Sequence, residues 1–108
     1  MSKHPIVDRA EVALDFSEKT YMGSFTRHSS FEADSDSQGV TVKLSRTGGD
    51  KREIDIHLHY HLFADILLEI AKGFEAGKLP DAVHSGHVER AVTRLHDALG
   101  SKDATKAD

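Results

Sequence analysis

The chain of 108 residues contains no cysteine and no tryptophan. Without cysteine, disulfide bonds, a thiol nucleophile and thiolate metal sites are excluded. No apolar run approaches the roughly 18 residues that a membrane-spanning helix needs. The N-terminal stretch MSKHPIVDRAEV also carries charges where a signal peptide has its apolar core. We therefore expect a cytoplasmic protein with no membrane partner.

Positive charge is scarce as well: 14 Lys and Arg residues stand against 18 Asp and Glu residues, a formal net charge of −4 at pH 7. Nucleic-acid binding needs a surplus of basic residues, so we expect no nucleic-acid partner. The local exception is Arg90 and Arg94, four positions apart on a predicted helix. They can bind an acidic partner or a phosphate, or they can pair with Glu89 and Asp97.

The sequence lacks the familiar catalytic motifs, namely a nucleophile elbow, a P-loop and a dinucleotide-binding glycine fingerprint. No Ser-His-Asp triad can be assembled from it either. Histidine, with eight residues, is the abundant chemically versatile type. The sequence therefore favours a non-catalytic protein over an enzyme.

The length fits a single domain, which we place at residues 11–100. Residues 1–10 are polar and contain Pro5, so we expect a flexible arm there. Residues 101–108 hold no large apolar side chain, and we expect a disordered tail.

Alternating apolar residues predict three to four antiparallel strands in the first half of the chain. The alternating ranges are 11–16, 19–34, 39–46 and 52–60. Within the second range, residues 27–30 are polar on both sides and indicate a bulge or an exposed turn. The stretch TGGD at 47–50 provides the glycines that a tight hairpin turn needs.

A polar loop is expected between two of these strands, at DSDSQG. Asp34, Asp36 and Gly39 stand at the spacing of a calcium-binding loop, but Ser45 occupies the position that requires glutamate. We therefore predict an ordinary hairpin loop whose Asp side chains bond their own backbone.

After Tyr60 the apolar spacing changes to three and four residues, which predicts a helix ending at a Gly77 cap before Pro80. A second helix carries Val88, Val92, Leu95 and Leu99 on one stripe and is expected to stop at Gly100. Ser85 is the preferred N-cap, and Pro80 with Asp81 the alternative start. The predicted class is α+β: an antiparallel meander followed by two helices packed on one sheet face.

One sheet face then stays uncovered. The alternation assigns it a common set of polar residues, namely Thr41, Lys43, Glu53, Asp55, His57 and His59. We expect a small soluble binding or regulatory module that self-associates as a homodimer through an uncovered sheet face and binds a protein or small molecule. The residues proposed for the binding surface are Lys43, Glu53, Asp55, Arg90 and Arg94.

The stretch IDIHLHYHLFAD supports an alternative, a metal-binding protein or metal-dependent enzyme. His57 and His59 alternate on a strand, so their Cα atoms lie roughly 6.5–7 Å apart and both imidazoles can reach one zinc ion. His61 is the candidate third ligand if the strand continues. If a helix begins near Tyr60, His61 instead pairs with Asp65. Solvent-facing histidines that need no cofactor are the competing interpretation.

Overall fold

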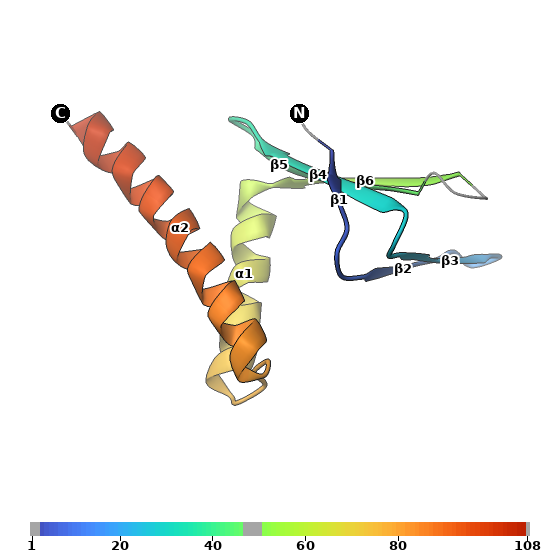
Figure 1. Cartoon of the computed structure of the whole chain (residues 1–108). Coiled ribbons are helices and arrows are strands. Elements are labelled where there is room, and N and C mark those ends of the chain that lie inside the picture. Colours follow the sequence, from blue (N-terminus) through green and yellow to red (C-terminus); the bar gives the residue numbers. More distant parts are fainter. Residues whose placement is uncertain (1–2, 47–50, 108) are drawn as a thin grey trace. The chain divides into compact units, whose positions relative to one another are not determined.

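The computed structural model of the chain describes residues 3–46 and 51–107, and side chains no further than residue 100. The chain forms two compact units, residues 1–67 and residues 68–108. The first contains every strand and the second contains the long C-terminal helix (Figure 1).

Within the described residues the elements are β1 (His4–Pro5), β2 (Ala10–Asp15), β3 (Thr20–Phe25), β4 (Ser29–Ser35), β5 (Gly39–Arg46), β6 (Arg52–His59), α1 (Tyr60–Glu75) and α2 (Ala82–Ala107). One sheet has the strand order β1-β4-β5-β6, and β2 with β3 forms a separate hairpin. All these strand pairs are antiparallel. The α+β class is confirmed, whereas the expected number of three to four strands is wrong, because the described chain has six.

The polar residues 27–30 explain part of that difference, because they divide the second alternating range into β3 and β4. His28 has a φ of 68°, and the N–H of Ser29 donates to the carbonyl of Thr26 at 3.1 Å. Positive φ breaks the extended backbone of a strand. The chain therefore leaves the hairpin here and enters the larger sheet.

Strand β1 accounts for the rest, since it lies in the segment expected to be a flexible arm. His4 stands opposite Phe31, with ring centroids 5.3 Å apart, and Pro5 stands opposite Ser30. Proline is tolerated there because β1 is an edge strand.

The loop between β4 and β5 is the predicted polar hairpin. The side chain of Asp36 accepts hydrogen bonds from the N–H groups of Gln38 and Gly39 at 2.8 and 3.0 Å. The side chain of Asp34 accepts one from the N–H of Ser35 at 2.8 Å. The tight turn expected at residues 47–50, between β5 and β6, lies outside the described residues.

The change from strand to helix falls between His59 and Tyr60, as predicted. Gly77, with a φ of 94°, confirms the predicted C-terminal cap of α1. The N–H of Lys78 donates to the carbonyl of Gly73 at 3.0 Å, which closes the last turn.

Helix α2 begins at the alternative start that the sequence offered, and it extends beyond the predicted end. Its N-cap is Asp81, whose Oδ1 accepts the N–H of His84 at 2.9 Å. Ser85 lies inside the first turn, so its assignment as N-cap is wrong. The expected stop at Gly100 is also wrong, because one glycine costs a helix only about 1 kcal/mol and no proline follows. Disorder of residues 101–108 stays a prediction.

Apolar side chains are covered only sparsely within the described residues. Phe25, 3% exposed, is the buried large apolar residue there. Leu14 of β2 is 45% exposed. On the apolar face of the larger sheet, Phe31 and Ile56 are 37% and 39% exposed. Packing of helices on one sheet face stays a prediction. None of the described helices is long and apolar enough to cross a membrane.

Candidate binding surface

The polar face of the larger sheet gathers the residues expected to form a recognition surface. Strands β5 and β6 pair with Thr41 opposite His57, Lys43 opposite Asp55 and Ser45 opposite Glu53. Residues directly opposite in an antiparallel pair project to the same side. Lys43 Nζ lies 3.9 Å from Asp55 Oδ2, a loose ion pair whose Asp55 side chain is 55% exposed. The polar face therefore offers both signs of charge to a partner.

His57 and His59 lie side by side at the end of this face. Their ring centroids are 4.9 Å apart and the rings meet edge to face. The Asp36 carboxylate lies near both imidazoles. Hydrogen bonds from Gln38 and Gly39 hold the pKa of Asp36 below its ordinary value, and the two nearby imidazoles act in the same direction. The hydroxyl of Tyr60 donates to the carbonyl of Asp36 at 2.6 Å and ties this loop to the start of α1.

A third metal ligand is the missing part of the predicted zinc site. His61 and Asp65 lie on α1, beyond the end of the strand that carries His57 and His59. Among the described residues, no three His, Asp or Glu side chains come together in a geometry that could hold a metal ion. His57 and His59 therefore form a pair among the described residues, and a metal site at this pair stays a prediction.

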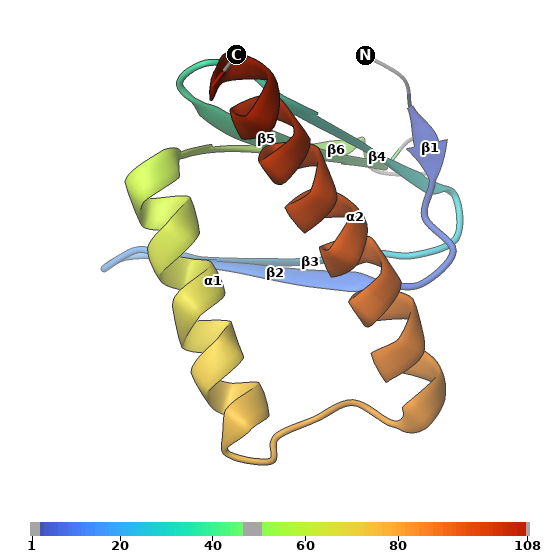
Figure 2. The same ribbon diagram turned by 90° about the vertical axis from the view of Figure 1, so that its left-hand side faces the viewer.

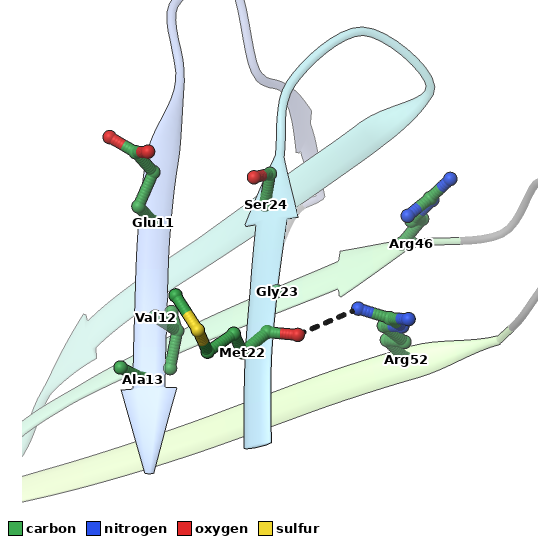
Figure 3. Close-up of a pocket in the computed structure, with 8 residues that line it drawn as sticks. All are labelled: Glu11, Val12, Ala13, Met22, Gly23, Ser24, Arg46 and Arg52. Carbon is green, nitrogen blue, oxygen red and sulfur yellow. Dashed lines mark hydrogen bonds between the residues drawn. The ribbon is translucent and has the colours of Figure 1, made fainter. Parts of the chain in front are cut away.

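A second feature, which sequence reasoning missed, is a hollow of about 370 Å³ between the β2–β3 hairpin and the ends of β5 and β6 (Figure 3). The Arg52 guanidinium donates to the carbonyl of Met22 at 3.1 Å (Figure 3). Gly23 permits this approach, because a Cβ on Gly23 would lie only 3.0 Å from Nη1 of Arg52. Arg46 stands opposite Arg52 in the sheet and lines the same hollow.

Two arginines in opposite positions were a signal in the sequence. Like charges directly across a strand pair repel, so such a pair needs a neutralising partner or a polar neighbour. The wall beside Arg46 and Arg52 includes Val12, Ala13 and Met22. An adjoining hollow of about 600 Å³ is lined by further residues of the hairpin, among them Leu14 and Tyr21. Figure 2 shows this hairpin along one side of the sheet. This region therefore combines two guanidinium groups with an apolar wall.

Arg90 and Arg94 lie on α2, beside a shallow hollow of about 300 Å³ that Glu89, Thr93 and Asp97 complete. Neither arginine forms an ion pair within 4.0 Å in the part of the chain that the structure describes. The predicted pairing with Glu89 and Asp97 is therefore not formed, and an acidic partner for these two residues stays a prediction.

Comparison with known proteins adds no relative: no family model, curated protein or solved structure matches the chain.

Proposed function

We propose that the protein is a small, non-catalytic binding or regulatory module that works as a homodimer. The polar face of its larger sheet, with Lys43, Asp55 and Glu53, is the surface that recognises a partner protein or small molecule. Self-association covers apolar surface carried by the unit of residues 1–67.

The exposed apolar face of the larger sheet carries this proposal. Phe31 and Ile56 remain more than a third exposed, and their cross-strand neighbours Leu44 and Val42 are only half-buried. Contiguous apolar surface of this kind marks interaction sites on soluble proteins. A second copy is the partner that every molecule of the protein meets, and closed two-fold dimers are the commonest oligomers.

Sedimentation equilibrium between 1 and 200 μM tests the proposal. Wild-type protein should form a dimer. Phe31→Arg then tests whether the apolar face is the contact, because a charge there weakens a dimer that buries this face. Glu32→Arg is the matched control, because it places the same side chain on the neighbouring residue, on the opposite face of β4. A wild-type protein that stays monomeric over the whole range contradicts the proposal.

A second candidate, zinc binding, is favoured by one observation: the 4.9 Å separation of the His57 and His59 rings. Two imidazoles supply half of a tetrahedral site, so carboxylates or a second copy must complete it. Titration of untagged protein with zinc, followed by calorimetry, tests this function. A double variant His57→Ala, His59→Ala should lose the binding; a wild-type protein that binds no zinc at 100 μM rules it out.

A further inference from the structure

Strand β6 has a free edge. It pairs with β5 on one side, and among the described residues no strand pairs with its other side. Such an edge presents unpaired N–H and C=O groups and is a template for another strand. Proteins usually protect an edge with proline, lysine or a bulge. Strand β6 has no proline, lysine or bulge, since its sequence is REIDIHLH and its register with β5 is continuous; of the usual protective residues it carries only the charged Arg52, Glu53 and Asp55.

The order of charges along β6 is self-complementary. On the polar face the first half carries the acids Glu53 and Asp55, and the second half carries His57 and His59. Consider two copies of β6 placed antiparallel around a two-fold axis at Ile56. Asp55 then stands opposite His57 of the second copy, and Glu53 opposite His59 of the second copy. On the other face Ile54 meets Leu58, and Ile56 meets itself.

Other registers lose this match. A slip by two residues moves the two-fold axis to Asp55 or to His57. In the first case Asp55 stands opposite Asp55 of the second copy, and in the second case His57 stands opposite His57 of the second copy. A slip by one residue sets the polar face of one sheet against the apolar face of the other. Parallel pairing in register aligns every acid with an acid. An imidazole N–H can donate to a carboxylate that stands opposite it, whereas two opposite carboxylates repel each other, so the register about Ile56 is favoured.

We propose that β6 pairs antiparallel with β6 of a second copy about Ile56, so that the larger sheet continues through the dimer. This inference rests on the proposed self-association and places the contact at the edge of β6, not on the apolar face that Phe31→Arg tests. The required side chains are available, because Glu53, Asp55, His57 and His59 are all exposed. The pairing also joins the two apolar faces into one continuous surface.

The same arrangement bears on the histidine pair. His57 and His59 of one copy face Asp55 and Glu53 of the other, and two imidazoles with carboxylate oxygens form a donor set that zinc accepts. Zinc is therefore expected to shift the equilibrium toward the dimer. Loss of this shift in the double variant His57→Ala, His59→Ala would assign it to these imidazoles.

Charge exchange within β6 tests the pairing directly. In the dimer of His57→Asp, the new carboxylate of each copy stands opposite Asp55 of the other copy. The two repulsive pairs should raise the dimer Kd about tenfold. The double variant Asp55→His, His57→Asp has the composition of the wild-type protein and restores both opposite pairs, so its Kd should return to within about threefold of wild type. Circular dichroism of each variant verifies that it is folded.

Cysteine crosslinking reports the register, and the chain contains no native cysteine to interfere. In Ile56→Cys the two introduced thiols face each other with Cβ atoms about 4.5–5.5 Å apart, so mild oxidation should give a covalent dimer. In the control Ile54→Cys they are about 13 Å apart along the strand and should stay reduced. Equal crosslinking of both variants overturns the register.

The outcomes separate the two proposals. A monomeric wild-type protein contradicts the proposed self-association and the β6 pairing together. A wild-type dimer whose Kd is unchanged by His57→Asp but raised by Phe31→Arg overturns the β6 pairing alone, and it assigns the interface to the apolar face.

Discussion

Replacement of Gly39 by alanine is expected to destabilise the β5–β6 pairing that builds the polar face. Gly39 is buried at the start of β5, opposite His59. A Cβ at this position would overlap the carbonyl oxygen of Leu58 and lie 3.1 Å from the Cα of His59. These atoms belong to the backbone and cannot rotate away, so the strands must separate locally. Overpacking of this kind costs typically about 1–3 kcal/mol.

Two further contacts increase the effect, because Gly39 is also fixed by the adjoining loop. Its N–H donates to Asp36 Oδ1 at 3.0 Å, and its carbonyl accepts the N–H of Asp36 at 3.0 Å. A displaced Gly39 strains both bonds. We therefore expect Gly39→Ala to lower the free energy of unfolding by about 2–3 kcal/mol, the upper part of that range. With a urea m-value of about 2 kcal/mol/M, the midpoint of unfolding should fall by about 1 M.

The matched control is Gly73→Ala, the same chemical change in α1. A Cβ on Gly73 would meet no atom within 4 Å, and alanine favours the helical backbone over glycine by about 0.5–1 kcal/mol. Its midpoint should rise where that of Gly39→Ala falls. Both variants are compared with wild type at one protein concentration, because dimerisation shifts apparent stability. A Gly39→Ala midpoint equal to the wild-type value would refute the steric reasoning.

Three other perturbations follow from single contacts. Tyr60→Phe removes the hydrogen bond to the Asp36 carbonyl and should lower the free energy of unfolding by about 0.5–1 kcal/mol in urea titrations; no change would mean that water replaces the bond fully. Arg52→Met retains the length of the side chain but cannot donate to the Met22 carbonyl, so amide hydrogens of β2 and β3 should exchange faster; unaltered exchange would show that the contact does not hold the hairpin. Hydrogen bonds from backbone N–H groups lower the pKa of Asp36 and of Asp81 in the folded chain. The two carboxylates therefore contribute fully to the free energy of unfolding above the unfolded pKa near 4, and this contribution is lost as the pH falls through their folded pKa values. Thermal melts from pH 6 to pH 3 should show this loss, and Asp81→Asn should reduce it; an equal loss in that variant would exclude Asp81 as a source.

Much of the fold was predictable because local chemistry decides it. The alternation in 39–46 and 52–60 predicts β5 and β6, and the change of period predicts the helix that begins at Tyr60. Gly77 was identifiable as a cap because a positive φ favours glycine. The division at residues 27–30 was visible only as a polar interval. Which sheet each half joins depends on contacts between distant segments, and alternation carries no information on those.

The candidate site shows the same division between local and distant information. Periodicity correctly placed His57 and His59 on one side of a strand with Asp55. It could not supply a third metal ligand, because that requires another element at a known distance. The hollow beside Arg46 and Arg52 was missed for a related reason: the hairpin that forms its other wall is separated from these arginines by β4 and a loop in the sequence.

The stretch IDIHLHYH therefore contains two kinds of information. The alternation of its residues shows which side chains lie on the same face of the strand, whatever covers that face. The order of charge along the strand states something else, since acids precede histidines about a central isoleucine. Strand β5 matches only part of this order, because Lys43 pairs with Asp55 whereas Thr41 and Ser45, opposite His57 and Glu53, carry no charge. At a free edge a second copy can pair antiparallel, and the acids of one copy then stand opposite the histidines of the other. Under the proposed pairing, the histidines that first suggest a metal site are half of a symmetric strand pairing, and the zinc titration of the dimer tests whether they also bind a metal.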